Sequence, residues 1–203
     1  MKILCIGRNY AEHAKELNNP LPKEPVFFMK PDTALLKDGA PFYHPDFSSD
    51  IHHEIEIVLR VGKAGKHISP EHALKYIDGI SVGVDFTARD LQQQCKEKGL
   101  PWEKAKAFDG SAPIGKFIPF TEAHQSSEIV FGLLVNGEIR QQGSSNDMIF
   151  NFQSIITYLS QFVTLKTGDL IYTGTPSGVS AVKIGDQLIG TLNGEQLLSF
   201  VVK

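Results

Sequence analysis

The sequence predicts a mixed α+β domain with a β-rich core, and three observations lead to this fold class. Strand-like apolar runs dominate the 203 residues and do not alternate regularly with helical patterns. Two Asn-Gly pairs, Asn136-Gly137 and Asn193-Gly194, are each flanked by apolar positions, which is a strong signal for a β-hairpin. Helical spacing occurs only in short segments. We therefore expect a single domain over residues 1–203 with few short helices.

The helices are predicted from capping residues and apolar spacing. They are expected over residues 10–17, 87–98 and 151–161, with one or two further turns over residues 71–76. Asn9 and Glu12 have the spacing of an N-cap residue followed by an acid, and Thr87 and Asp90 repeat that pattern. Gly99 is the expected stop signal of the second helix.

Short apolar or alternating runs predict strands over residues 26–29, 54–59 and 80–86. Two Gly-Asp pairs, Gly168-Asp169 and Gly185-Asp186, each precede another strand-like run. Such pairs are typical of turns, so each is expected to introduce a strand.

Composition excludes several classes of function. The formal net charge is −3, the pI is about 6.2, and lysine and arginine do not cluster, so we expect neither nucleic acid nor a membrane surface as a partner. Two cysteines, Cys5 and Cys95, are too few for a disulfide framework or a four-cysteine zinc site. No apolar run reaches the roughly 18–20 residues of a membrane span, and no signal-peptide pattern begins the chain. The sequence therefore predicts a cytoplasmic protein.

Three acidic residues indicate a metal site. In a strand, Glu54 and Glu56 would share one face while Ile55 and Ile57 occupy the other. An isolated Glu-x-Glu pair is usually exposed to solvent, but this strand continues into apolar residues and two buried like charges need neutralisation. Asp85 ends another apolar run and also needs a partner. Three carboxylates without cysteine favour Mg²⁺, with Mn²⁺ or Ca²⁺ as alternatives.

A histidine and a glutamate form a candidate base on the first short helix. His13 and Glu16 are three residues apart, so their side chains share a face. A carboxylate next to an imidazole raises its basicity, although such a pair is more often an ordinary solvated helix surface. The helix is short and Asn18, Asn19 and Pro20 follow it as a hinge. We therefore expect residues 8–18 to form a mobile lid helix.

Other candidate binding residues follow these acids along the chain. Arg89 and Gln92 share a helix face just after Asp85 and are expected to line the same pocket. Residues 173–178 form a glycine-containing loop with hydroxyl and backbone donors, which suits a carboxylate. Lys106, one of many lysines, would ordinarily be a surface residue.

Taken together, these segments resemble the fumarylacetoacetate hydrolase family. The resemblance is closest to its short single-domain members, the acylpyruvate hydrolases and oxaloacetate decarboxylases. The matching stretches, in family order, are GRNYAEHAKEL (7–17), PVFFMKP (25–31), HHEIEIVLRVGK (52–63), GVDFTARDLQ (83–92), KGLPWEKAKAFDGSAPIG (98–115), VNGEIRQQG (135–143) and LIYTGTPSGV (170–179).

The resemblance implies a role for each site residue. It implies metal ligands at Glu54, Glu56 and Asp85, substrate-binding residues at Arg89, Gln92 and Thr175, and catalytic residues at His13, Glu16 and Lys106. It also implies the mixed β-sandwich roll of the fumarylacetoacetase C-terminal type, usually as a homodimer. A further aspartate ligand of full-length fumarylacetoacetase has no counterpart here, so water or substrate would take its place.

The implied function is Mg²⁺-dependent hydrolysis of the carbon–carbon bond of acylpyruvates (2,4-dioxo acids) through a metal-held pyruvate enolate. Decarboxylation of oxaloacetate, another small 2-oxo acid, is expected as a side or main activity. The alternative is an isomerase or decarboxylase of the 2-hydroxyhepta-2,4-diene-1,7-dioate type in aromatic catabolism. A non-catalytic ligand-binding protein is the remote alternative, and the presence of every site position argues against it.

Overall fold

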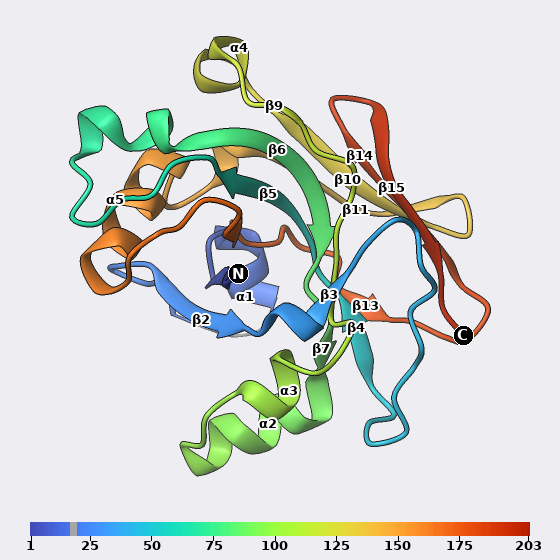
Figure 1. Ribbon diagram of the computed structural model, residues 1–203. Helices are drawn as coiled ribbons and strands as arrows, with labels where there is room; N and C mark the ends of the chain where they lie inside the picture. Colours follow the sequence, from blue (N-terminus) through green and yellow to red (C-terminus); the bar gives the residue numbers. More distant parts are fainter. Residues whose placement is uncertain (17–19) are drawn as a thin grey trace.

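Two β-sheets make up most of the fold (Figure 1). The structure, a computed structural model, describes residues 1–16 and 20–203. The six-stranded sheet contains, in spatial order, β2 (Val26–Lys30), β1 (Ile3–Gly7), β12 (Leu170–Tyr172), β5 (Ile55–Val61), β6 (Ile77–Val84) and β9 (Ile118–Pro119). The four-stranded sheet contains β11 (Glu138–Ser144), β10 (Val130–Val135), β14 (Gln187–Leu192) and β15 (Glu195–Val201). The predicted α+β class is confirmed.

Short strands and helices complete the described part of the chain. The small sheets are β13 (Ser180–Ala181), β4 (Ile51–His53) and β7 (Thr87–Ala88), and β3 (Leu35–Leu36) with β8 (Ala112–Pro113). The α-helices are α1 (Ala11–Glu16), α2 (Arg89–Lys98), α3 (Glu103–Lys106), α4 (Glu122–Ser126) and α5 (Phe152–Phe162). The 3₁₀ helices are η1 (Asp32–Ala34), η2 (Pro70–Tyr76) and η3 (Ser145–Asp147). None of these described helices has the length and apolar character needed to cross a membrane.

The main core lies between the two large sheets, where β14 and β15 pack on β6 and β10 packs on β5. Ile55, Ile57 and Leu59 of β5 point into this core and are completely buried, as their alternation in the sequence predicts. The sheets approach closely at Gly190 of β14, where an added Cβ would lie 3.0 Å from the Val82 side chain. The glycine therefore permits the sheet contact.

The pairing of β5 with β6 determines where the acidic residues lie. The strands are antiparallel with Ile55 opposite Val84, and the Asp85 amide continues the pairing by donating to the Glu54 carbonyl at 2.8 Å. Glu56 points to the face opposite the main core, because its neighbours in β5 point into it. The two glutamates and Asp85 therefore meet at one end of the strand pair.

The predicted strand and turn signals are largely confirmed. Both Asn-Gly pairs form hairpin turns with positive φ at both residues, 53° and 82° at Asn136-Gly137 and 48° and 82° at Asn193-Gly194. The two predicted Gly-Asp turns directly precede β12 and β14. Gly99 ends α2 in the left-handed conformation, with φ at 62°.

Two predicted helix caps are wrong. The Asn9 side chain does not serve α1; instead its Oδ1 accepts from Phe150 N and its Nδ2 donates to the carbonyls of Phe150 and Thr173. Because Asn9 is fully buried, these bonds satisfy its amide while joining three segments. Thr87 lies in β7, so α2 begins later than the cap pattern predicts.

Of the remaining helices, α2 and α3 carry the predicted site residues Arg89, Gln92 and Lys106. α2 and α3 pack on each other and contact β7, and α3 also contacts β2 (Figure 1). The sequence did not indicate α3. α5 begins as predicted after Asn151, whose side chain accepts from Ser154 N, and it packs on η2. Cys5 and Cys95 are both buried, free cysteines.

Candidate active site

Three buried carboxylates form the centre of the candidate site. Glu54, Glu56 and Asp85 each offer an oxygen within 4.8 Å of the other two, and each is at most 5% exposed. The antiparallel register described above brings them together, as the same-face argument predicts. Three buried negative charges at this separation repel one another, so their neighbours must supply positive charge.

Two lysines supply part of that charge. Lys106 of α3 lies 2.8 Å from an oxygen of Glu54 and 2.8 Å from Oδ2 of Asp85. Lys30, the last residue of β2, lies 2.7 Å from Oδ1 of Asp85, but its ammonium hydrogens go to Ser111 and to the Phe86 carbonyl. Both lysines are almost completely buried. Lys106 is therefore not at the surface, where a lysine ordinarily lies.

The pKa values of the two glutamates shift in opposite directions because their partners differ. Burial alone would raise the pKa of Glu54, but Lys106 and Arg89 hold it well below the usual range. Glu56 has no cation of its own: burial and the nearby Asp85 charge raise its pKa well above the usual value, against a hydrogen bond from Gly174. Burial would lower the pKa of Lys106, but the carboxylates of Asp85 and Glu54 raise it.

These donors fit a divalent cation. Oδ1 of Asp85 is buried, and the Lys30 ammonium at 2.7 Å takes at most one of its two lone pairs, so one lone pair is left to offer. Glu56 lacks the positive charge that Glu54 and Asp85 obtain from their neighbours. A hard cation coordinated by one oxygen from each carboxylate would supply that charge and use the free lone pair.

Arg89 and Gln92 enter the site from the first turn of α2, as their spacing predicts. Nη2 of Arg89 donates to Oε1 of Glu54 at 2.5 Å, and Nη1 donates to Oε1 of Gln92 at 2.7 Å. The Nε hydrogen of Arg89 is buried and meets no acceptor among the described residues. One donor of the guanidinium is therefore available to a ligand.

The predicted histidine–glutamate pair forms on α1. Nδ1 of His13 lies 3.1 Å from Oε2 of Glu16, and the imidazole is 6% exposed. The other glutamate oxygen accepts from Gly178 N at 3.2 Å. Glu16 thus ties the pair to the 173–178 loop, although its side chain is 34% exposed. The predicted hinge residues Asn18 and Asn19 lie outside the described residues.

Backbone amides of the loop that follows β12 donate hydrogen bonds to the protein's own carboxylates. Gly174 N donates to Oε2 of Glu56 at 2.6 Å, just as Gly178 N serves Glu16. Gly174 has φ at 105°, and an added Cβ would lie 2.6 Å from that of Asn9, so only glycine fits there. Thr175, 3% exposed, is the loop residue that faces the site.

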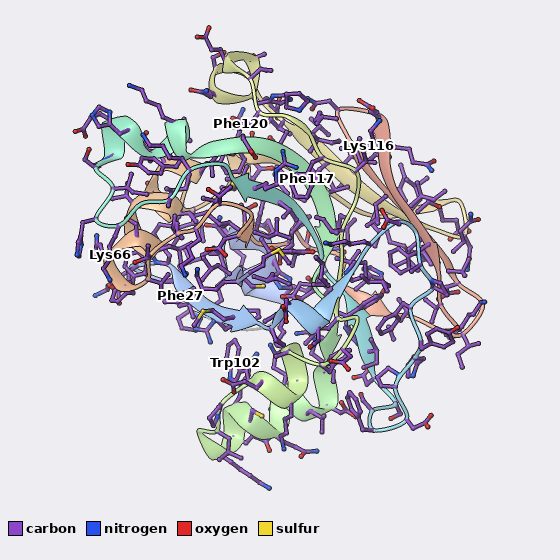
Figure 2. All side chains as sticks on the ribbon, in the orientation of Figure 1. Phe27, Lys66, Trp102, Lys116, Phe117 and Phe120 are labelled. Carbon is purple, nitrogen blue, oxygen red and sulfur yellow. The ribbon has the colours of Figure 1, made fainter. Side chains whose placement is uncertain are left out.

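Eight of the nine predicted site residues line one small cavity, and Glu16 contacts it through His13. Its volume is about 40 Å³, enough for a few water molecules but not for a 2-oxo acid. Trp102 closes one side, where it contacts Phe28 of β2 and lies beside α3 (Figure 2). A wider hollow elsewhere, along β3 and β15, contains none of these nine residues.

Several cavity residues were not predicted. Arg8 and Lys96 line the cavity, yet nothing in the sequence separates them from other charged residues. Lys30 carried a usable signal, because a lysine that directly follows the apolar run of residues 26–29 has to meet an acid when the strand is buried. Gln141, which holds Thr175, lies in a polar stretch of β11 and gave no signal.

Comparisons with known proteins agree with this arrangement. A family model described as the fumarylacetoacetate (FAA) hydrolase C-terminal domain matches residues 2–198. Oxaloacetate tautomerase YcgM from Escherichia coli (strain K12) is 44% identical over 202 residues, covering 99% of this chain and 92% of that protein. The mitochondrial oxaloacetate tautomerase FAHD1 from Mus musculus is 42% identical over 201 residues, covering 99% and 91%.

A solved structure extends the similarity to the whole fold. Fumarylpyruvate hydrolase from Pseudomonas aeruginosa, in complex with Mn²⁺ and pyruvate, superposes with a TM-score of 0.92 at 40% sequence identity, covering 100% of this chain and 89% of that one. Family match, sequence identity and fold thus agree over almost the full length. The chain therefore belongs to the fumarylacetoacetate hydrolase family, and its fold is that of the family's C-terminal domain.

Proposed function

We propose that the chain is a Mg²⁺-dependent enzyme that moves a proton to or from the carbon next to the 2-oxo group of a small 2-oxo acid. One observation carries this proposal: an oriented imidazole, a buried ammonium group and three metal-competent carboxylates line a single cavity. The relatives named above as oxaloacetate tautomerases support oxaloacetate as the main substrate.

Glu54, Glu56 and Asp85 would hold the ion, and their all-oxygen donor set favours Mg²⁺ over softer metals, with Mn²⁺ and Ca²⁺ as alternatives. The bound ion would supply Lewis-acid polarisation of the 2-oxo group. The similar structure in complex with Mn²⁺ and pyruvate supports a divalent ion and a 2-oxo acid as ligands.

His13 would act as the base. Because an ionised carboxylate only accepts hydrogen bonds, the contact with Glu16 places the ring hydrogen on Nδ1 and leaves the lone pair on Nε2. Nε2 would take a proton from the carbon beside the 2-oxo group, whose C–H electron pair then enters a C=C bond. Lys106 lies in the same cavity, so its ammonium can stabilise the negative charge that collects on the enolate oxygen. Return of the proton to that oxygen completes tautomerisation.

The charge at the cavity favours a substrate with two carboxylates. Arg8 and Lys96 line the cavity together with Arg89. The pKa of Lys96 is lowered by burial first and then by the positive charges of Arg89 and Arg8, which shows that like charges meet here. A dianion such as oxaloacetate would relieve this repulsion more than a monoanion would. Loss of its distal carboxylate as CO₂ would instead give the enolate of pyruvate, whose negative charge collects on the same 2-oxo oxygen, so decarboxylation accompanies this proposal.

Hydrolysis of acylpyruvates is the second candidate, and the His13–Glu16 pair favours it. The same Nε2 lone pair could deprotonate a water molecule that attacks the distal carbonyl, after which the carbon–carbon bond breaks and pyruvate leaves as its enolate. The fumarylpyruvate hydrolase among the similar structures supports this reaction. Isomerisation of a longer dienoic 2-hydroxy acid would need the same proton transfer without that water.

A substrate panel tests the proposal. Tautomerisation and decarboxylation of oxaloacetate and hydrolysis of acetylpyruvate and fumarylpyruvate are measured with Mg²⁺, Mn²⁺, Ca²⁺ and a chelator. We expect metal-dependent turnover, highest on the dicarboxylic substrates, and loss of tautomerisation and hydrolysis in His13→Ala. Binding of 2-oxo acids without turnover of any of them would instead support the remote alternative of a non-catalytic ligand-binding protein.

The homodimer and the cytoplasmic location stay predictions. Sedimentation velocity would test the first, for which the family resemblance is the only support. The relatives include both a bacterial and a mitochondrial protein, so cell fractionation has to test the second.

A further inference from the structure

A buried glutamine joins the four-stranded sheet to the candidate site. Gln141 of β11 is 1% exposed, and all four of its amide bonds are made within the protein. Its Oε1 accepts from Nδ1 of His53 at 2.8 Å and from Ile55 N at 3.0 Å. Its Nε2 donates to Oγ1 of Thr175 at 2.8 Å and to the Pro176 carbonyl at 2.9 Å.

The orientation of this amide follows from the two main-chain partners alone. Ile55 N can only donate, so it has to face the amide oxygen, and the Pro176 carbonyl can only accept, so it has to face the amide nitrogen. A flipped amide would place two donors together on one side and two acceptors together on the other. The Nε2–H bond to Thr175 is therefore fixed in direction.

This fixed bond decides what the Thr175 hydroxyl can do. Its oxygen receives a hydrogen from Gln141, so the hydroxyl hydrogen has to point elsewhere. No described residue accepts that hydrogen, and Thr175 faces the cavity that contains Glu54 and Lys106. Thr175 is thus presented to the cavity as a hydrogen-bond donor.

We propose that Gln141 is a positioning residue that fixes the Thr175 hydroxyl as a donor to a carboxylate oxygen of the bound 2-oxo acid. This rests on the proposed function, since a carboxylate only accepts hydrogen bonds and a donor is what it needs. Gln141 also bonds Ile55, which lies between Glu54 and Glu56, so the same amide holds the donor at a set distance from the metal-binding strand.

The direct test is Gln141→Glu, which keeps the size and the acceptor side but replaces the donor to Thr175 with a second acceptor. The threonine hydrogen would then turn toward the introduced carboxylate and away from the cavity. Pyruvate is the ligand probe, with Mn²⁺ present at saturation. Trp102 is the only tryptophan of the chain and lines the cavity, so its fluorescence reports binding without turnover.

We expect Gln141→Glu to weaken pyruvate binding by roughly 10- to 100-fold, the usual range for a hydrogen bond to a charged group. KM for oxaloacetate should rise by a similar factor while kcat changes less. Gln142→Glu is the matched control, since it makes the same change on the exposed face of β11 and should leave pyruvate binding unchanged.

A double-mutant cycle separates positioning from a merely structural role. In a Thr175→Val background, Gln141→Glu should weaken pyruvate binding no further, because the hydroxyl through which it acts is gone. An equal additional loss in that background would overturn the proposal. So would unchanged pyruvate binding in a folded Gln141→Glu variant when Thr175→Val does weaken it.

Gln141→Leu covers the case in which a buried carboxylate prevents folding. This variant removes the donor to Thr175 without putting an acceptor in its place, so pyruvate binding should weaken. The effect should again vanish in the Thr175→Val background. Persistence of the Gln141→Leu effect in that background would overturn the proposal. Absence of pyruvate binding in the unmodified protein would instead count against the proposed function, and the two failures are therefore distinguishable.

Discussion

A single ammonium group, that of Lys106, joins two of the three site carboxylates. It lies 2.8 Å from Glu54 and from Asp85, although each of these acids also has a second cationic partner. The side chain comes from a helix of one turn, α3, which is held by its packing on α2 and β2. The position of one lysine therefore depends on tertiary contacts more than on helix propensity.

Lys106→Met should lower turnover of oxaloacetate by about 10²–10³-fold, the usual loss when one preorganised charge is removed from an enolate-forming site. It should also lower the free energy of unfolding of the metal-free protein by about 3–5 kcal/mol, because two buried carboxylates lose a partner. Steady-state kinetics at saturating Mg²⁺ and urea denaturation measure the two effects. Lys104→Met, on the exposed face of α3, is the control, and near-normal kinetics in Lys106→Met would remove Lys106 from the mechanism.

Glu56→Gln should abolish Mg²⁺ binding while leaving the metal-free protein at least as stable as before. Glu56 is the acid whose pKa is raised well above its usual value, by burial first and by the Asp85 charge next, so its ionisation is unfavourable without a metal. Calorimetric titration with Mg²⁺ and thermal unfolding of the chelated protein check both parts. Glu54→Gln is the informative comparison, because it breaks contacts with Lys106 and Arg89 and should destabilise the protein. Normal Mg²⁺ affinity in Glu56→Gln would show that the ion binds elsewhere.

At the scale of single elements, α1 carries the proposed base, His13, which lines the cavity. Its six residues are too few to be stable in isolation, and the described contact that ties its end to the body is the bond from Gly178 N to Glu16. The cavity beneath has room for only a few water molecules. We therefore propose that α1 moves aside when a substrate enters, as the predicted lid requires.

His13→Ala separates the candidate reactions on this element. Acylpyruvate hydrolysis and oxaloacetate tautomerisation should fall by roughly 10²–10⁴-fold, the usual contribution of a general base. Decarboxylation should fall much less, since it needs neither an activated water nor removal of a proton from carbon. Parallel assays on one enzyme preparation provide the measurement, with Glu12→Gln on the exposed side of α1 as control. Equal loss of all three activities would mean that His13 acts mainly in closing the cavity.

A second element-scale prediction concerns the parallel pair β1 and β12. Asp169, just before β12, accepts from the backbone amides of Lys2 and Lys166, each at 2.8 Å, and from the Lys2 ammonium. Burial alone would raise the pKa of Asp169, but the hydrogen bonds from Lys2 and Lys166 lower it below its usual 3.8. The stability that it contributes is therefore complete above the unfolded-state pKa and is lost as the pH falls through the lower folded-state value.

Asp169→Asn should accordingly cost about 1–3 kcal/mol of unfolding free energy at pH 7, and the difference from the unmodified protein should shrink toward zero below pH about 3. Urea denaturation across that range measures it. Asp109→Asn, at an exposed position, serves as the control. A difference that stays constant with pH would mean that the ionisation of Asp169 does not stabilise the strand pair.

At the scale of the whole molecule, local sequence patterns were enough to predict those features that depend on residues close together in the sequence. The alternation around Glu54, the spacing of His13 and Glu16 and both Asn-Gly turns are of this kind. The prediction failed where a side chain forms its hydrogen bonds with residues that are distant in sequence. Asn9 looks like a cap but binds Phe150 and Thr173, more than 140 residues away. Gln141 belongs to the site only because two sheets pack, and no pattern in β11 shows that.

The hairpin of β5 and β6 has a practical consequence for inserting foreign sequence. The acids lie where β5 starts and β6 ends, so the connection over residues 62–76 lies at the far end, roughly 20 Å of strand away. Figure 2 shows Lys66 of this connection beside α5, and Lys63 and Ala64 are exposed. An epitope tag between Lys63 and Ala64 should leave catalysis and Mg²⁺ affinity intact. One extra residue within β5 would instead place Glu54 on the same face as the core side chains that follow the insertion. The same geometry that fixes the site thus leaves a permissive position for labelling or immobilising the enzyme.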